Sequence, residues 1–209
     1  MRTLIVAATE QEIAGVVAAI GRSSDRHEVL VTGVGMVATA ARCSRAIART
    51  PYDCALNFGV CGSFDRALVP GTVVHVVSDR IAELGAQDGD AFMPIEALNL
   101  LGADDRAELV NAAPPDARAL QALPQVRGIT VNTVHGDDRS IAEAVRRFDP
   151  QVESMEGAAF MYACTIGGVP FAQVRAVSNI VERRNRAAWR LQDAIAALNA
   201  AALAIADQL

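Results

Sequence analysis

Short apolar segments alternate with segments of helical periodicity along the whole chain of 209 residues. The apolar segments have the length of buried strands and lie at residues 2–8, 27–32, 54–60, 73–78, 128–134 and 170–178. Helical patterns occupy 9–20, 36–49, 141–148, 155–167 and 191–209, and a short helix is expected to start at Pro114 and Pro115. Residues 84–102 follow neither pattern. This alternation is typical of an α/β fold in which helices cover a central sheet.

The chain is expected to form one domain over residues 1–209, because no linker or internal repeat interrupts the alternation. Its hydrophobic content of 52% is sufficient for one well-packed core. The net charge of the chain is −5, whereas nucleic-acid-binding proteins have a basic surface, so no nucleic acid is predicted as a partner.

Nothing in the sequence predicts a membrane span or a secreted protein. The apolar run at residues 2–8 is too short and wrongly flanked for a signal peptide. The alanine-rich run at 194–206 is broken by Asn199 and is shorter than a membrane span. The four cysteines show no CxxC spacing, so we expect reduced core residues in a cytoplasmic protein.

Polar residues interrupt the apolar pattern at two places near the C-terminal end. Arg175, Ser178 and Asn179 occupy the end of one strand, and Glu156 follows Met155 at the start of a nearly all-apolar helix. Strands of α/β domains deliver polar side chains to a ligand crevice beyond their carboxyl ends. A buried carboxylate needs a partner or ligand hydroxyls. The alternative for Glu156 is a purely structural role at the helix N-terminus.

The segments VESMEGAAF at residues 152–160 and PFAQVRAVSN at 170–179 resemble the nucleoside phosphorylase/nucleosidase superfamily. The resemblance implies a three-layer αβα sandwich with a central mixed β-sheet and a small-molecule nucleoside as substrate. It also implies that Met155 packs against the ribose, that Glu156 accepts hydrogen bonds from the ribose diol, and that the end of the second segment reads the purine.

Two glycine-rich segments follow strands, and both are expected to be turns that approach the ligand. TGVGMVATAA at residues 32–41 and NFGVCGSF at 57–64 resemble segments of the same superfamily, which places Val60, Cys61 and Gly62 at the substrate. Neither segment matches a dinucleotide-binding fingerprint, and the histidines show no metal-ligand spacing, so no cofactor and no metal are predicted. His135 is the one histidine placed near the purine side by the resemblance.

Asn57 and Val60 stand where phosphorylases of the superfamily carry the Arg and Ser that grip phosphate. Without a cation or hydroxyl at these positions, phosphate would lose its charge-assisted donors. The sequence therefore favours water as the nucleophile. Val60 also departs from the nucleosidases, which often carry Ser at this point.

Glu12 lies in the first turn of the helix at 9–20, together with Glu10. Acidic residues in a first turn stabilise the helix, which is the structural alternative for both. The resemblance places Glu12 where nucleosidases have the glutamate that orients the attacking water. We expect Glu12, with Arg175, to position water, and Glu10 to be a helix-terminus charge. Arg175 has the alternative role of an ion-pair partner for Glu12 or Glu156.

Asn179 is expected to select the base. A 6-oxopurine presents two acceptors, N7 and O6, whereas adenine presents an acceptor beside an amino donor. The carboxamide of Asn179 has two N–H donors, which suit both acceptors of hypoxanthine or guanine. Asn179 would also stabilise the negative charge that develops on the departing base.

Arginines 183, 184, 186 and 190 form a cluster beyond Asn179, in the segment SNIVERRNRAAWR. The cluster is either a solvated helix entry or a wall for an acidic substrate tail, and Arg184 is the residue we expect to contact substrate. This segment, with residues 84–95 and 130–136, resembles the futalosine hydrolase family. That resemblance implies cleavage of a hypoxanthine nucleoside carrying an acidic 5′ group.

The apolar stretch around Phe92, Met93 and Ile95 resembles a segment that, in related enzymes, forms part of the substrate pocket of a neighbouring subunit. We therefore expect a homo-oligomer, a dimer or larger, in which Phe92 contacts the substrate.

Two other functions stay open: another purine nucleosidase or phosphorylase, acting on 6-oxopurine or methylthioadenosine-type nucleosides, and a non-catalytic nucleoside-binding protein. An inactive homologue would be expected to lose Glu12 or Glu156, and both are present.

Overall fold

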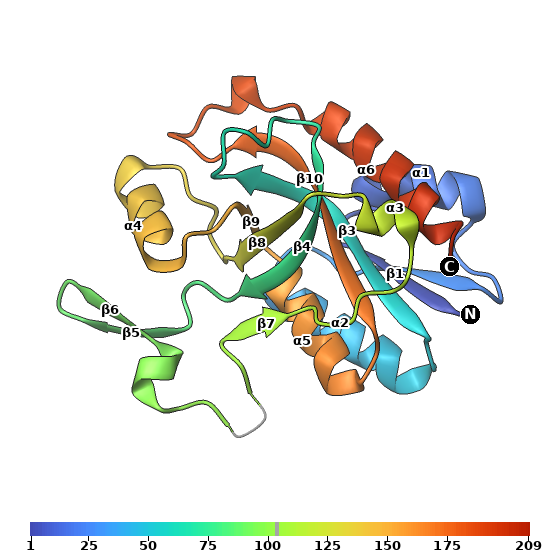
Figure 1. The fold of residues 1–209 in the computed structure, drawn as a ribbon, viewed down its shortest axis with the longest axis horizontal. Coiled ribbons are helices and arrows are strands. Elements are labelled where there is room, and N and C mark those ends of the chain that lie inside the picture. The colour runs from blue at the N-terminus through green and yellow to red at the C-terminus, as the bar shows by residue number, and fades with distance from the viewer. Residues whose placement is uncertain (103–104) are drawn as a thin grey trace.

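The structure is a computed structural model and describes residues 1–102 and 105–209. These residues form an eight-stranded mixed sheet with the order β10-β4-β8-β9-β3-β1-β2, in which β7 also pairs with β4 (Figure 1). Its strands are β1 (Thr3–Ala7), β2 (His27–Val31), β3 (Cys54–Ser63), β4 (Val73–Arg80), β7 (Glu108–Val110), β8 (Gln125–Thr130), β9 (Val152–Ser154) and β10 (Phe171–Ile180). A separate hairpin consists of β5 (Gly85–Asp88) and β6 (Ala91–Pro94).

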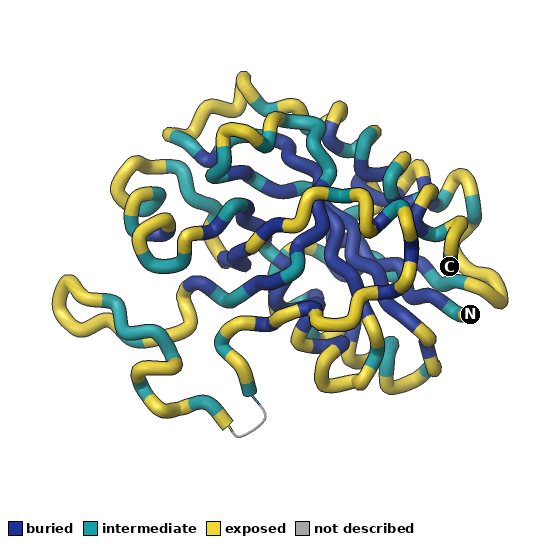
Figure 2. Tube along the Cα trace, viewed as in Figure 1, coloured by how far each residue is buried: buried dark blue, intermediate teal, exposed yellow. Residues whose placement is uncertain are grey.

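Helices cover both faces of the strands β1, β3 and β10. The helices are α1 (Glu10–Ile20), α2 (Met36–Arg49), α3 (Arg118–Gln121), α4 (Asp138–Phe148), α5 (Gly157–Gly167) and α6 (Leu191–Ala206), with 3₁₀ turns at Ile95–Leu98 and Arg186–Ala188. One core lies between the strands and α1, α3 and α6, and a second lies between the strands and α2 and α5. In β1, Ile5 faces the first core and Leu4 the second, and all five residues of this strand are buried (Figure 2).

The sheet closes on itself. Strand β10 pairs with β3 in parallel from Phe171 to Ile180 and with β4 in the antiparallel direction, so β10, β4, β8, β9 and β3 form a ring. A register shift between Val177 and Asn179 gives β10 a bulge, and bulges bend a strand and increase its twist. The predicted α/β fold with a mixed sheet is confirmed. The barrel-like closure departs from the flat central layer of the predicted three-layer αβα sandwich.

The side chain of Asn199 from α6 is inserted into the backbone ladder of α1. Its Oδ1 accepts a hydrogen bond from Val16 N at 2.9 Å, and its Nδ2 donates to Glu12 O at 2.9 Å. These two backbone groups are four residues apart and would bond to each other in an uninterrupted helix. The contact requires glycine at position 15, since a Cβ there would lie 2.8 Å from Asn199 Oδ1. Asn199 thus fixes α6 against the helix that carries Glu12.

Several segments differ from the expectations. The glycines of NFGVCGSF lie within β3 and do not form a turn, because pairing with β10 and β9 continues to Ser63. Residues 84–102 were expected to be irregular but contain the β5–β6 hairpin, in which Gly89 supplies a positive φ of 58° at the first loop position. The short helix α3 begins three residues after Pro115. No helix among the described residues is long and apolar enough to cross a membrane.

Candidate active site

A cavity of about 320 Å³ lies beyond the carboxyl end of β1 and beside the C-terminal halves of β3 and β10, where the N-terminus of α1 meets them. Eight of the eleven residues predicted to form the site line it: Glu12, Val60, Cys61, Gly62, Met155, Glu156, Ser178 and Asn179. They come from α1, β3, β10 and the connection between β9 and α5, and the folded chain brings them together at the strand ends, as a ligand crevice of an α/β fold requires.

Glu12 has two roles at this cavity. Thr9 caps α1, and Glu12 Oε2 accepts hydrogen bonds from Thr9 N at 2.9 Å and Thr9 Oγ1 at 2.8 Å, which completes a capping box. Its other oxygen, Oε1, accepts from Val60 N at 3.1 Å. The structural role considered for Glu12 is therefore real, and the same contacts hold its carboxylate in a fixed position at the cavity wall.

Glu156 precedes α5 and makes no side-chain hydrogen bond to cap it. Its Oε1 instead accepts from Gly35 N at 2.9 Å, and its Oε2 lies 3.8 Å from Arg175 Nη1. Burial raises the pKa of the Glu156 carboxyl, and the charge of Arg175 opposes this effect. The contacts place the Glu156 carboxylate in the cavity wall and argue against the alternative of a helix-terminus charge.

Arg175 is fully buried and lies behind the cavity wall, which it does not line. Its Nε donates to Gln173 Oε1 at 3.0 Å, and its Nη2 donates to Asn57 Oδ1. Gln173 in turn donates to Asp79, and burial raises the pKa of the Asp79 carboxyl to about 6. Nη1 has no hydrogen-bond partner within the described residues and lies next to Glu156. The alternative of an ion-pair partner for Glu156 fits this geometry, and the role in positioning water stays a prediction.

Asn179 lines the cavity with its carboxamide held in one orientation. Its Nδ2 donates to Ile180 O at 3.0 Å, and its Oδ1 accepts from Ser178 Oγ at 2.8 Å. If the amide were flipped, Asn179 Oδ1 would face Ile180 O, and two acceptors would repel each other. The contact with Ile180 therefore fixes the position of the amide nitrogen. One N–H of Nδ2 is left for a ligand, so the expectation that both N–H groups of Asn179 meet the base does not hold in this orientation, because Ile180 O accepts from the other.

Two predicted site residues lie elsewhere in this chain. Arg184 stacks over the ring of Trp189 at 5.5 Å, and it is Trp189 that lines the cavity. Phe92 packs against the ring of Phe148 and under the guanidinium of Arg147 in the same chain. Their predicted contacts with substrate stay predictions. Trp189 was not among the predicted site residues, although it belongs to the segment SNIVERRNRAAWR that carries the resemblance to futalosine hydrolases.

Glu153 and His135 form a pair at the cavity that the sequence reading did not assemble. Glu153 is 3% exposed and lines the cavity, and its oxygens accept from His135 N at 3.1 Å and contact His135 Nδ1 at 2.5 Å. The hydrogen bond to Glu153 raises the pKa of His135 above its usual value. The available signal was a second acidic residue inside the apolar segment that also contains Glu156.

The remaining chemistry of the site is limited. Cys61 lines the cavity, but burial raises the pKa of its thiol to about 12, so it is not a nucleophile at neutral pH. Within residues 1–102 and 105–209, no group of three or more His, Cys, Asp or Glu side chains is arranged to hold a metal ion.

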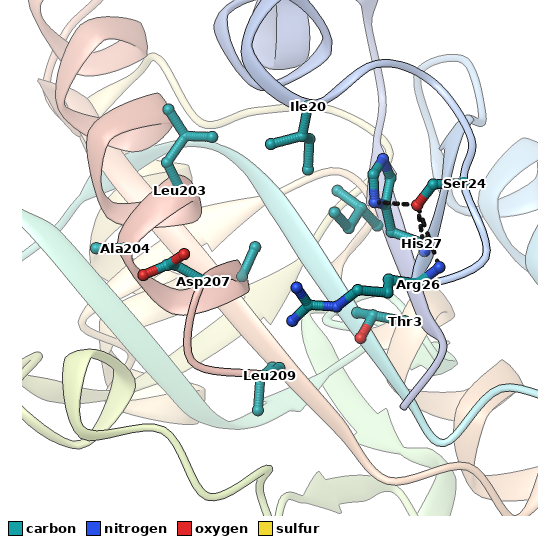
Figure 3. A pocket seen from close by; sticks show the side chains of 11 residues that line it. Thr3, Ile20, Ser24, Arg26, His27, Leu203, Ala204, Asp207 and Leu209 are labelled. Carbon is teal, nitrogen blue, oxygen red and sulfur yellow. Dashed lines mark hydrogen bonds between the residues drawn. The ribbon is translucent and has the colours of Figure 1, made fainter.

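A larger cavity of about 580 Å³ lies at the opposite end of the parallel strands, between the end of α6 and the start of β1 and β2 (Figure 3). Ile20, Leu203 and Leu209 give it apolar walls, with Arg26 and Asp207 at its edge. In α/β folds, ligands bind in the crevice beyond the carboxyl ends of the parallel strands. The smaller cavity, with its three buried carboxylates, is therefore the candidate active site.

A family model described as the phosphorylase superfamily matches residues 6–208. The chain belongs to the phosphorylase superfamily. Within it, the chain is 34% identical to the futalosine hydrolase of Acidothermus cellulolyticus, over 87% of this chain and 80% of that protein. It is 35% identical to the futalosine hydrolase of Streptomyces coelicolor, over 85% and 77% of the two chains. A methylthioadenosine/S-adenosylhomocysteine nucleosidase of a Marinomonas species is 28% identical, over 84% and 78%.

Solved structures of the phosphorylase superfamily share the fold. A methylthioadenosine/S-adenosylhomocysteine nucleosidase of Neisseria meningitidis, in complex with methylthio-immucillin-A, aligns with a TM-score of 0.83 and 18% identity over 100% of both chains. A futalosine hydrolase of Helicobacter pylori aligns with a TM-score of 0.82 and 14% identity, over 100% of this chain and 98% of that one. The resemblance described from the sequence and the predicted enzyme class, an N-glycosyl hydrolase, are confirmed by the sequence relatives.

Proposed function

We propose that this chain hydrolyses the N-glycosidic bond of futalosine and releases hypoxanthine, a step of the futalosine route to menaquinone. The observation that carries the proposal is Asn179 in the cavity, with its amide donor fixed by Ile180 and Ser178. A fixed N–H donor suits the acceptors of a 6-oxopurine. The sequence identity to futalosine hydrolases supports the same substrate.

In this proposal, Glu156 accepts hydrogen bonds from the 2′- and 3′-hydroxyls of the ribose. Its Oε1 already accepts from Gly35 N at 2.9 Å, which orients the carboxylate and leaves lone pairs for the diol. Burial raises the pKa of the Glu156 carboxyl, and the positive charge of Arg175 behind it works in the opposite direction and favours the ionised form. Two hydroxyls held in this way fix the sugar relative to the cavity wall.

Glu12 orients the attacking water on the sugar. As the bond from the anomeric carbon to the base breaks, its electron pair goes to the base, and the carbon becomes oxocarbenium-like. Water adds to this carbon and gives a proton to Glu12, whose carboxylate is held by Thr9 and Val60. Asn179 stabilises the negative charge that develops on the departing base. The base then takes up a proton from solvent and Glu12 returns its proton to solvent, so that neutral hypoxanthine is released.

Water is the nucleophile in this proposal because the wall of β3 offers phosphate few donors. The amide nitrogen of Asn57 already donates to Val6 O at 3.3 Å, and Val60 presents an apolar side chain. The guanidinium of Arg175 is fully buried behind the wall. A phosphate ion at this position would lack charge-assisted hydrogen bonds.

A nucleosidase for methylthioadenosine-type substrates is the second candidate. Relatives with that name are 26–31% identical to the chain. Asn179 argues against this candidate, because its free N–H would meet the amino group of adenine. A non-catalytic nucleoside-binding protein is disfavoured by the presence of both Glu12 and Glu156 at the cavity.

We also propose a homo-oligomer in the cytoplasm. The β5–β6 hairpin extends away from the body of the molecule (Figure 1), in agreement with a segment that reaches a neighbouring copy. Phe92 on this hairpin would then complete the neighbour's site. Light scattering is expected to give a dimer or larger species, and a monomer at working concentration would reject the assignment of Phe92.

The function is tested with purified protein and three nucleosides: futalosine, inosine and methylthioadenosine, each with and without phosphate. We expect hypoxanthine to be released from futalosine at a rate independent of phosphate, together with the free sugar product. Formation of a sugar 1-phosphate would contradict hydrolysis. Faster turnover of methylthioadenosine than of futalosine would favour the second candidate.

A further inference from the structure

Asp79 of β4 is a buried carboxylate outside the candidate active site. It is 1% exposed, and two side chains donate hydrogen bonds to it: Thr130 Oγ1 to Oδ1 at 3.0 Å, and Gln173 Nε2 to Oδ2 at 3.0 Å. An ionised carboxylate in such a place requires donors, since burial alone disfavours its charge. None of the three residues lines the cavity, so none of them contacts a ligand there directly.

The hydrogen-bond chain through Gln173 leads to Arg175. Gln173 Oε1 accepts from Arg175 Nε at 3.0 Å, while the amide nitrogen donates to Asp79. A carboxylate only accepts and a guanidinium only donates, so both neighbours require the same orientation of the Gln173 amide. Arg175 Nη2 donates to Asn57 Oδ1, which holds a second edge of the guanidinium. The remaining nitrogen, Nη1, has no hydrogen-bond partner in the described part of the chain and lies 3.8 Å from Glu156 Oε2.

The hydrogen-bond chain through Thr130 leads to the start of α5. Thr130 Oγ1 accepts from Ala158 N at 2.7 Å and donates its own hydrogen to Asp79. Ala158 is two residues after Glu156. A Cβ at position 157, between them, would lie 2.2 Å from Asp79 Oδ2, so the backbone beside Glu156 rests directly on this carboxylate. Asp79 thus connects the helix that follows Glu156 with the guanidinium that faces Glu156.

We propose that Asp79 and Gln173 are positioning residues for the proposed hydrolysis. They hold Arg175 in place beside the carboxylate of Glu156, and they also support the backbone at the start of α5. This inference rests on the role of Glu156 in the proposed function. Arg175 and Glu12 are the charged groups that face Glu156. If Arg175 moved away, the effect of burial would be unopposed, the pKa of the Glu156 carboxyl would rise, and a protonated carboxyl accepts ribose hydroxyls less well.

The test begins with Gln173→Met, which keeps the length of the side chain but removes the acceptor for Arg175 Nε. We expect KM for futalosine to rise about tenfold with kcat lowered by less than about threefold, because a charged hydrogen bond that supports substrate binding is lost. A partly unfolded preparation would instead lower the apparent kcat and leave KM unchanged. NMR titration of the side-chain carboxyl is expected to show a higher pKa of Glu156. An unchanged KM, or an unchanged pKa of Glu156, in the folded variant overturns the proposal.

Asn111→Leu is the matched control. Asn111 is also a buried amide, and its Nδ2 donates to Phe171 O at 2.7 Å, on the same strand as Gln173. We expect this variant to unfold at a lower temperature but to keep the KM of the wild type and its pKa of Glu156. A rise in KM equal to that of Gln173→Met would show a general effect of lost packing and would reject the positioning role.

The double variant Asp79→Asn/Gln173→Glu exchanges the carboxylate and the carboxamide. The carboxylate at position 173 can still accept from Arg175 Nε, and the amide at position 79 can donate to it and accept from Thr130. We expect KM to return to within about threefold of the wild type, since the pattern of donors and acceptors is restored. A KM as high as that of Gln173→Met would contradict the proposal.

Thr130→Val takes the place of Gln173→Met if that variant does not fold. It keeps the shape of the side chain and removes the link from Asp79 to Ala158 N, so we expect KM to rise here too, and an unchanged KM overturns the proposal. Failure of the proposed function looks different: the wild type would then release no hypoxanthine from futalosine. The pKa of Glu156 is measured without a nucleoside, so it still tests the positioning role in that case.

Discussion

Replacing Gly59 by alanine is expected to displace Arg175 and to lower both stability and activity. A Cβ at position 59 would lie 2.1 Å from Arg175 Nη1 and 3.2 Å from Glu12 Oε1. The guanidinium cannot move aside freely, because it is fully buried and bonded to Gln173 and Asn57. The change therefore disturbs the residue behind Glu156 without altering any side chain of the site.

The expected loss of folding stability follows from the packing and hydrogen bonds that the added methyl group of Gly59→Ala would disturb. Overpacking a filled interior costs about 1–3 kcal/mol, and weakening one hydrogen bond to a charged group costs about 1.5–3 kcal/mol. We expect a loss of about 3 kcal/mol, which lowers the Tm of a chain of this size by about 6–12 °C. Misplacing the reacting groups by about 1 Å can cost about a hundredfold in kcat/KM.

Gly136→Ala is the matched control for Gly59→Ala. Position 136 has no positive φ, and the nearest atom to a Cβ there is Arg184 Cβ at 3.5 Å, an ordinary contact. We expect this variant to stay within about 0.5 kcal/mol of the wild type. Thermal unfolding and steady-state turnover of both variants check the reasoning. A Gly59→Ala protein with the Tm and kcat/KM of the wild type would refute the claim that Arg175 is held in place.

Three further outcomes are expected. Glu156→Gln should fold normally and lose about a hundredfold or more in turnover, because it loses charged hydrogen bonds to the ribose; circular dichroism and a rate assay check this. Asn179→Asp should lose about ten- to hundredfold in kcat/KM on the hypoxanthine nucleoside at neutral pH and recover partly at lower pH, and full activity there would remove Asn179 as base reader. In NMR titrations, the pKa of His135 should lie above 6.5 and fall in Glu153→Gln. Because the pKa of His135 is higher in the folded than in the unfolded protein, protonated His135 stabilises the fold below a pH of about 6.5, and this stabilisation disappears as the pH rises through the folded-state pKa. Glu83 and Asp137 also face His135, and their charges raise its pKa slightly.

The local sequence patterns were sufficient to predict the α/β class and to name eight residues that line one cavity, the candidate active site. Residues such as Glu156 and Asn179 interrupt apolar segments, and an apolar segment with a polar end has few explanations other than a buried strand or helix that leads to a ligand. The capping box at Thr9 and Glu12 is equally local, since its residues are three positions apart. These features require no knowledge of distant contacts.

The closure of the sheet could not be predicted in the same way. It depends on pairing between β3 and β10, which are more than a hundred positions apart, and periodicity within a segment does not specify its partners. The same pairing makes Gly59 and Gly62 strand residues, although glycine usually indicates a turn. Strand β9 has only three residues, too few for a recognisable alternation, and so the alignment of Glu153 with Gly62 was not visible.

The insertion of Asn199 into α1 affects the order in which the protein can be completed on the ribosome. Glu12 is synthesised long before Asn199, and its backbone carbonyl group is bonded by the side chain of Asn199, 187 positions later. At about 5–20 residues per second, translation of the intervening chain takes about 10–40 s. During this time Val16 N and Glu12 O lack the side chain that bonds them in the folded protein and can bond to each other instead. The part of α1 that contains Glu12 therefore reaches its final state only after Asn199 has been synthesised.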